Sequence, residues 1–242
     1  MKTFHGPTFG TAVFLYLLLF LTSALEEGEI TSKVKFPPSS SPSFPRLVMV
    51  GTLPDLQEIT LCYWFKVNHL KSTLTIFSYN TAKNDNELLT SLEKQGAFHM
   101  NVHGAPQLKV QCPNKIHIGK WHHVCHTWSS WEGEATIGVD GFHCKGNATG
   151  IAMGVTLSQG GLVVLGQEQD SVGGEYDAEQ SLEGELSELN LWNTVLNHEQ
   201  IKHLSKCAHP SERHIHGNII QWDKTQFQAY DGVVLSPNEI CA

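Results

Sequence analysis

The sequence predicts an all-β fold, a sandwich of two antiparallel sheets with one short helix. Short stretches of alternating apolar residues recur about every ten residues and are separated by glycine-rich turns. Only one segment carries the capping pattern of a helix. At 242 residues and 40% hydrophobic content, the chain can form the core of one large β domain. Many short strands with little helix pack as two layered sheets.

The clearest strand is Leu61 to Val67, in which apolar residues alternate with Cys62, Trp64 and Lys66. This period of two is typical of a strand with one buried face. Asp140-Gly141 predicts a tight hairpin turn after one of the later strands. The segment from Ser32 to Pro45 is rich in proline and serine and is interpreted as an irregular lead-in. Further strands are expected at Trp121–Trp128, Thr136–Val139, Gly161–Leu165 and Leu186–Trp192.

The single helix is expected to begin after Asn197, which can act as its N-cap with Gln200 at the third helical position. Leu196 can pack on Ile201 across the first turn, and Pro210 prevents continuation.

This helix contains the sequence HEQIKH, which resembles a zinc motif. However, His198 and His203 are five residues apart and so point about 140° away from each other on a helix. Two zinc-ligating histidines need a spacing of four, so no zinc site is expected here.

The N-terminal segment has the features of a secretory signal peptide, assigned to residues 1–24, with a mature domain at 25–242. Lys2 precedes the apolar run from Thr11 to Leu21, and small residues follow it. The run is about half the length of a membrane-spanning helix, and no later stretch comes closer. The formal charge of -8, without a basic stripe, excludes a sequence-independent grip on nucleic acid. We therefore expect a secreted, extracellular protein.

All six cysteines lie in the mature part, and an even number in an oxidising compartment favours disulfides. Zinc is disfavoured because no two cysteines lie two to four residues apart. The sequon at Asn147 to Thr149 fits glycosylation of a surface loop.

An acidic loop, Gly166 to Gln180, follows the apolar run that ends at Leu165 and holds five acidic residues and no basic one. Calcium takes six to eight oxygen ligands from carboxylates, amides and carbonyls, and the loop supplies that mixture. Gly173-Gly174 would let the chain turn back on itself. Composition alone leaves two alternatives open, a calcium site and a solvated acidic loop. The candidate donors are Glu168, Gln169, Asp170, Asp177 and Gln180.

Three histidines within Trp121 to His126 raise the possibility of a metal or acid-base centre. On a strand, His122 and His126 face one side with Val124, while His123 faces the other beside Cys125. Packed or hydrogen-bonded histidines are the simpler interpretation. Neither a nucleophile elbow nor a phosphate-binding glycine loop is present, so no enzyme activity is expected.

The segment His123 to Ser130 fits the pentraxin signature H-x-C-x-[ST]-W-x-[ST] at each fixed position. Phe77-Ser78-Tyr79, the run Asp85-Asn86-Glu87-Leu88-Leu89 and the acidic loop also resemble pentraxin sequences. The resemblance extends from about Val34 to the C-terminus.

This resemblance implies a jelly-roll sandwich similar to legume lectins, with two adjacent calcium ions on one face of each protomer. One position departs from the short serum pentraxins, which have a glutamate where this chain has Asp177. The shorter side chain would loosen the second ion or admit a water. The implied ligands are Asp85, Asn86, Glu168, Asp170 and the carbonyl of Gln169 for the first ion, and Glu168, Asp170, Asp177 and Gln180 for the second.

The resemblance also implies the disulfide pairing. The family's common bridge would join Cys62 to Cys125, and Cys207 with Cys241 resembles the additional C-terminal pair of long pentraxins. Cys112 and Cys144 are then paired by elimination.

A pentraxin would be a secreted, calcium-dependent recognition protein of innate immunity or of synapses, assembled as a cyclic homopentamer. Its expected ligands are phosphorylated or anionic, such as phosphocholine, phosphoethanolamine and acidic glycans. Phosphocholine is disfavoured because Ser91 stands where a choline-contacting phenylalanine would be, and no acidic residue is found near Gly104 to Pro106. The alternative function is an adhesion module in extracellular or synaptic contacts.

Overall fold

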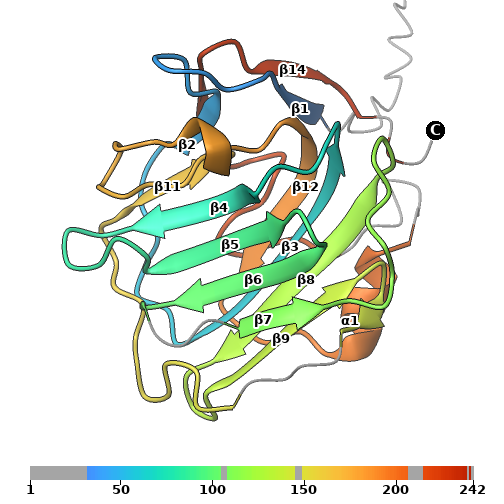
Figure 1. Cartoon of the computed structure of the whole chain (residues 1–242). Coiled ribbons are helices and arrows are strands. Elements are labelled where there is room, and N and C mark those ends of the chain that lie inside the picture. Colours follow the sequence, from blue (N-terminus) through green and yellow to red (C-terminus); the bar gives the residue numbers. More distant parts are fainter. Residues whose placement is uncertain (1–31, 105–107, 145–148, 207–214, 239, 241–242) are drawn as a thin grey trace, which may run out of the picture.

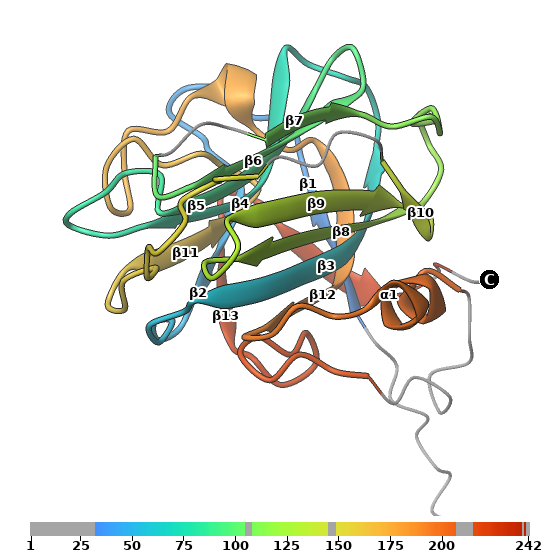
Figure 2. The same cartoon turned by 90° about the horizontal axis from the view of Figure 1, so that it is seen from below.

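The computed structural model describes residues 32–104, 108–144, 149–206, 215–238 and 240. Two antiparallel sheets of seven strands each pack face to face, which confirms the predicted sandwich (Figures 1 and 2). The first sheet has the order β10 (Phe142–His143), β9 (Glu134–Val139), β8 (His122–Ser129), β3 (Glu58–Val67), β12 (Gly184–Trp192), β1 (Ser32–Phe36) and β14 (Val234–Pro237). The second has the order β13 (Phe227–Tyr230), β2 (Arg46–Met49), β11 (Leu162–Leu165), β4 (Thr73–Asn80), β5 (Leu88–Glu93), β6 (Ala97–Val102) and β7 (Leu108–Gln111).

The core lies between the two sheets and is formed by every second residue of their strands. In β3, Leu61, Tyr63 and Phe65 are fully buried and face Phe98 and other apolar side chains of the second sheet. The alternation read from the sequence therefore identifies the inward face. None of the described helices is long and apolar enough to cross a lipid bilayer.

The outer face of β3 is also buried, which the alternation of Leu61 to Val67 did not predict. Helix α1 (His198–Leu204) lies against this face of the first sheet, as Figure 2 shows. Ile201 and Leu204 pack on a small second cluster that contains Cys62, Cys125 and Trp192. The sheet thus has two apolar layers, one toward the core and one toward the helix.

Two local predictions are confirmed in atomic detail. The β9–β10 hairpin turns at Asp140 and Gly141, which both have positive φ, 52° and 78°, as a two-residue turn of this kind requires. At α1, Asn197 and Gln200 form a reciprocal capping box, and Leu196 belongs to the same cluster as Ile201.

The interpretation of Ser32 to Pro45 as an irregular lead-in is wrong for its first five residues. Ser32–Phe36 form β1, which pairs with β12 on one side and β14 on the other. Val34 and Phe36 point into the core with 1% and 0% exposure. These two apolar residues are enough for a short strand because it is flanked on both sides.

Two disulfides match the expected pairs. Cys62–Cys125 joins directly opposed residues of β3 and β8, and Cys112–Cys144 joins the segments that follow β7 and β10. The third expected pair, Cys207 and Cys241, lies outside the described residues. So do Asn147, Pro210 and the segment 1–24.

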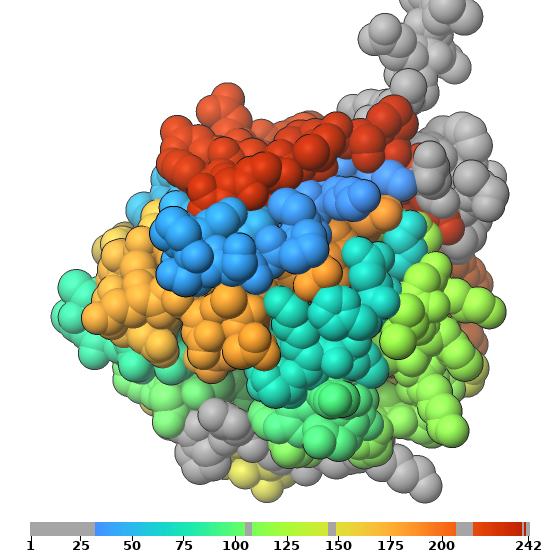
Figure 3. Space-filling view, turned by 45° about the horizontal axis from the view of Figure 1, so that its top comes forward, coloured from blue at the N-terminus to red at the C-terminus, as the bar shows by residue number. Residues whose placement is uncertain are grey.

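The C-terminal strands close one side of the sandwich. β14 pairs with β1 at the edge of the first sheet, and β13 pairs with β2 at the edge of the second. Figure 3 shows this C-terminal segment, in red, beside the N-terminal strands, in blue. The two N-terminal strands are therefore internal to their sheets.

Candidate metal centre

The acidic loop is fixed to the second sheet through Gln169. This side chain is fully buried, and its Nε2 donates to the carbonyl oxygens of Ser78 and Leu162 at 3.0 and 3.1 Å. Its Oε1 accepts from the N–H of Gly173 at 2.9 Å. These hydrogen bonds use the side-chain amide of Gln169 to anchor the loop. Only its main-chain carbonyl oxygen is then left for a metal, as the resemblance implied. That oxygen also accepts from Asn80 Nδ2 at 2.5 Å.

The loop turns back at the predicted glycines. Ser171 and Gly174 form an isolated antiparallel bridge, with the N–H of Gly174 donating to the carbonyl of Ser171 at 3.0 Å. Gly173 has a φ of 76°, a conformation that glycine adopts at little cost. The turn brings the second half of the loop back toward Glu168 and Asp170.

The second contribution comes from the β4–β5 loop. The N–H of Asn86 donates to Asn84 Oδ1 at 3.1 Å, and the carbonyl of Asn86 accepts from Gly104 N–H at 3.0 Å. The side-chain Oδ1 of Asn86 is buried and has no hydrogen-bond partner in the protein. A buried amide oxygen without a donor is costly, and a cation would satisfy it.

The third contribution comes from a single turn of 3-10 helix, η1 (Ala178–Gln180). Asp177 caps this turn, since its Oδ1 accepts from the N–H of Glu179 at 2.9 Å. The N–H of Gln180 donates to the carbonyl of Asp177 at 3.1 Å. Asp177 and Gln180, the two residues expected to ligate only the second ion, therefore lie on one compact turn.

Electrostatics shows that the carboxylates from these segments face one another. Burial, together with the charges of Asp170, Asp85 and Asp177, raises the pKa of Glu168 to about 7. Burial and the charges of Asp85, Glu175 and Asp177 also raise the pKa of Asp170. Residues far apart in the sequence thus share one negative potential, with Glu168 at its most buried point.

The carboxylates are close but not clustered on a single point. Among the described residues, no three of their oxygen atoms all lie within 4.8 Å of one another. The donor set of carboxylates, an unpaired amide oxygen and a main-chain carbonyl fits calcium, which accepts oxygen ligands in flexible geometry.

The histidines of the signature strand are packed, as predicted, and do not form a metal centre. His126 faces the core, stacked on Tyr63 with its Nε2 2.9 Å from the tyrosine hydroxyl. His122 accepts from the N–H of His117 and bonds to Asp140 at 2.9 Å.

On the opposite face, ligand atoms of Cys62, His123 and Cys125 lie within 4.8 Å of one another. The two sulfur atoms are bonded to each other, so this group offers no thiolate to a metal.

Several residues that shape the centre were not predicted. Ser78 belongs to the Phe77-Ser78-Tyr79 motif, but its role as the acceptor for Gln169 could not be read from the sequence. The Glu87 carboxylate is buried and accepts from the N–H of Ser158 while contacting His103 Nδ1 at 2.9 Å. Lys71 contacts η1 from a distant part of the chain. These contacts depend on which loops meet, and no short motif encodes that.

The face next to the acidic loop is polar. Ser91 lies on the outer face of β5, opposite Thr75 of β4 and His99 of β6, and is 5% exposed. Asn101, also on the outer face, has a buried Oδ1 without a hydrogen-bond partner. Of the other segment considered for choline recognition, Gly104 is described, whereas Ala105 and Pro106 lie outside the described residues.

Two packed antiparallel sheets, with carboxylates and amides on the loops at one face, place this chain in the class of all-β sandwich proteins. Within this class the sequence matches the Pentaxin family over residues 33–237, and the chain belongs to that family. Pentraxins are binding proteins without enzymatic activity, which confirms the expectation that this chain is not an enzyme.

Two relatives and one solved structure show the range of similarity. C-reactive protein 1.1 of Limulus polyphemus is 89% identical over 242 residues, the whole of both chains. Neuronal pentraxin-2 of Homo sapiens is 32% identical over 190 residues, which are 78% of this chain and 42% of that protein. The native heptameric SAP-like pentraxin from Limulus polyphemus superposes with a TM-score of 0.81 at 33% identity, covering 88% of this chain and 98% of that one.

Proposed function

We propose that the chain is a secreted, calcium-dependent recognition protein that holds two calcium ions per protomer. The observation that carries the proposal is the unpaired, buried Oδ1 of Asn86 on the same centre as Glu168, whose pKa burial and three neighbouring acids raise to about 7. Both groups gain from a divalent cation, since it pairs the amide oxygen and compensates the charges.

The two ions have the ligands that the resemblance implied. Glu168 and Asp170 would contribute to both ions, Asp85, Asn86 and the carbonyl of Gln169 to the first only, and Asp177 with Gln180 to the second only. Bound calcium supplies open coordination positions for a phosphate or carboxylate oxygen of a ligand. The chain's own hydrogen bonds orient the donors, through the buried Gln169 side chain and the cap at Asp177, and Glu168 is partly buried.

The ligand is proposed to be phosphorylated or anionic with further polar groups. The outer face of β5 and β6 carries the polar residues Ser91 and Asn101, so Ser91 provides no apolar wall for a quaternary ammonium. Phosphoethanolamine and acidic glycans therefore fit better than phosphocholine, whose quaternary ammonium has no hydrogen to donate.

The remaining expectations belong to the same proposal. Residues 1–24 form the signal peptide, Cys207 pairs with Cys241, and Asn147 carries a glycan. The protomers form a closed ring, which the heptameric state of the related Limulus structure supports.

Calcium titration by calorimetry, followed by retention on immobilised phosphoethanolamine, tests this function. We expect two ions per protomer, retention that EDTA abolishes, and weaker retention on phosphocholine. Glu168→Gln should lose both calcium and ligand, because it removes a charge shared by both ions. Glu132→Gln, the same change at an exposed site on the β8–β9 turn, should behave as wild type. Wild-type protein that binds no calcium would refute the proposal.

A further inference from the structure

The η1 turn, which presents Asp177 and Gln180, is attached to the second sheet by the side chain of Lys71. Lys71 precedes β4 in the chain and is only 12% exposed at its side chain. Its Nζ donates to the carbonyl of Ala178 and to Ser181 Oγ, both at 3.0 Å. Ala178 begins the turn and Ser181 ends it, so one ammonium group holds both ends.

The Lys71 amine is itself held in place by Glu183. Nζ lies 3.5 Å from Glu183 Oε2, and His69 Nε2 contacts the same oxygen at 3.2 Å. Two hydrogen bonds and one ion pair thus hold the ammonium group. The side chain therefore has one defined position, and its charge is compensated outside the acidic loop.

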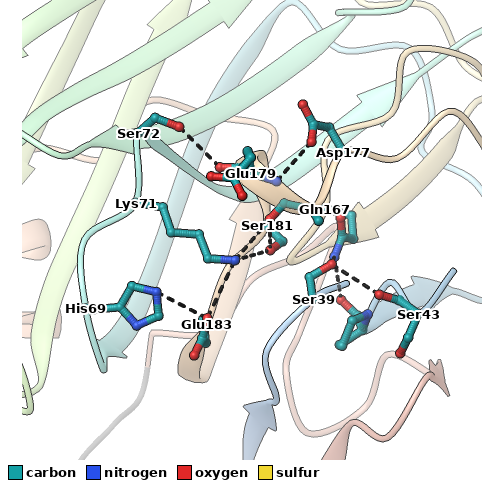
Figure 4. A network of polar contacts seen from close by, with 12 residues as sticks. Ser39, Ser43, His69, Lys71, Ser72, Gln167, Asp177, Glu179, Ser181 and Glu183 are labelled. Carbon is teal, nitrogen blue, oxygen red and sulfur yellow. Dashed lines mark hydrogen bonds and ion pairs between the residues drawn. The ribbon is translucent and has the colours of Figure 1, made fainter. Parts of the chain in front are cut away.

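Weaker contacts on the same side complete the attachment. Ser72 Oγ donates to the carbonyl of Glu179 at 3.4 Å, and Thr75 forms a parallel bridge with Ser181. Figure 4 shows Lys71 reaching the turn from the side of His69 and Glu183, whereas the Asp177 carboxylate points away from the amine. Lys71 thus holds the back of the turn and leaves the ligand side open to a cation.

We infer that Lys71 is a positioning residue for the second calcium ion. This inference rests on the proposed function. Lys71 presents Asp177 and Gln180 on a turn that is already formed before calcium binds. Ordering a short turn on binding costs conformational free energy, and a turn that is already ordered avoids that cost. The effect falls on the second ion, because none of the residues proposed to ligate only the first ion, Asp85, Asn86 and Gln169, contacts Lys71.

Lys71→Met tests this inference, because methionine keeps the apolar stem and removes the amine. Calorimetric titration should show the affinity of the weaker calcium step reduced about tenfold or more, the usual effect of losing a partner of a metal ligand. The tighter step should be unchanged. Ser181→Ala, a milder variant that removes one acceptor of the amine, should shift the same step in the same direction by less.

Two controls separate positioning from charge and from general stability. Lys109 of β7 forms an exposed ion pair with Glu93 of β5. Lys109→Met removes the same charge as Lys71→Met and should leave both calcium steps unchanged. Melting in EDTA should change little for Lys71→Met, whereas the gain in melting temperature on adding calcium should shrink. In an Asp177→Asn background the effect of Lys71→Met should be much smaller, since the two changes act through one turn.

The outcomes are distinguishable. If wild type binds two ions and Lys71→Met binds both as tightly, the inference fails while the proposed function stands. It also fails if both steps weaken equally with a lower melting temperature in EDTA, which is a merely structural effect. If wild type binds no calcium, the proposed function and the inference fail together.

Discussion

At the scale of single residues, the buried polar groups explain both stability and its dependence on pH. Tyr63 and His126 stack inside the sandwich and share a hydrogen bond of 2.9 Å. Burial lowers the pKa of His126 to about 3 and raises that of Tyr63. Both side chains are therefore neutral in the folded protein over the physiological range.

The neutral His126 predicts a loss of stability in acid. The unfolded chain takes up a proton on this imidazole below its ordinary pKa of 6.5, whereas the folded chain does so only near 3. The stabilising contribution is complete above 6.5 and is lost as the pH falls toward 3, by at most about 1.4 kcal/mol per pH unit. His126→Phe keeps a ring in the stack and removes the titration. Urea unfolding in EDTA at about pH 7 and about pH 4.5 should show a smaller loss for the variant; equal losses would contradict a buried, neutral His126.

The residues that could be predicted are those whose role is encoded by their neighbours in the sequence. The Asp140-Gly141 turn and the capping box of Asn197 need only local spacing, and both are confirmed. The two described disulfides could be predicted because family resemblance supplied one pair and elimination the other. The roles of Lys71 and Glu87 could not, since each depends on a loop distant in the sequence.

At the scale of elements, the acidic loop is held at two places on either side of Asp177. Lys71 fixes the η1 turn, and Arg46 of β2 fixes the residue before Asp177. The Arg46 guanidinium lies 4.8 Å from the ring of Tyr176 and 4.5 Å from that of Tyr230. It also pairs with Asp231 at 2.9 Å and donates to the carbonyl of Phe44. The loop is thereby tied to the C-terminal turn.

Arg46→Met should release the Tyr176 side of the loop. Each cation-π contact contributes about 0.5 to 1 kcal/mol, so the expected loss of unfolding free energy is about 1 to 2 kcal/mol. Limited chymotrypsin digestion should cut after Tyr176 faster in the variant, and most of all in EDTA, because calcium otherwise restrains the same loop. Arg46→Lys keeps the charge but loses the planar stacking, so its cleavage rate should lie between those of wild type and Arg46→Met. Cleavage that is unaffected by either calcium or the variant would contradict this picture of the loop.

The strands were predicted where alternation was strong and missed where it was weak. Leu186 to Trp192 lies within β12, and Gly161 to Leu165 contains β11, which begins one residue later. Gly161 itself lies where a Cβ would come within 2.2 Å of the Asn80 carbonyl oxygen, so glycine permits the close approach to β4. The strands β5 to β7 carry polar residues such as Ser91 and Asn101 on an outer face, and this polarity concealed them from a hydrophobic pattern.

At the scale of the whole molecule, the proposed ring assembly makes the binding faces act together. A single protomer that binds its ligand weakly is retained only briefly on a surface. When several binding faces belong to one rigid ring, binding at one face raises the effective concentration of the others near the same multivalent surface, and the overall affinity increases. The resemblance predicts five copies, whereas the related Limulus pentraxin has seven. The choice depends on small rotations between neighbouring subunits.

Sedimentation equilibrium with calcium should therefore give a single closed species of several copies. The mass divided by 26.8 kDa gives the copy number after correction for the proposed signal peptide and any glycan. We expect the same species in EDTA, because the calcium ligands proposed here all come from one protomer. A monomer at micromolar concentration would contradict the ring while leaving the fold and the metal centre unaffected.

The internal position of β1 and β2 has a consequence for how the protein is made. Each of these first strands lies between two strands that are synthesised much later: β12 and β14 for β1, and β11 and β13 for β2. While the chain is emerging from the ribosome, both therefore lack their partners and expose pairing edges that can recruit other chains. The first sheet cannot be completed until β14 has left the ribosome. Premature termination before β13 would leave two open edges, and such chains should depend on chaperones or be degraded.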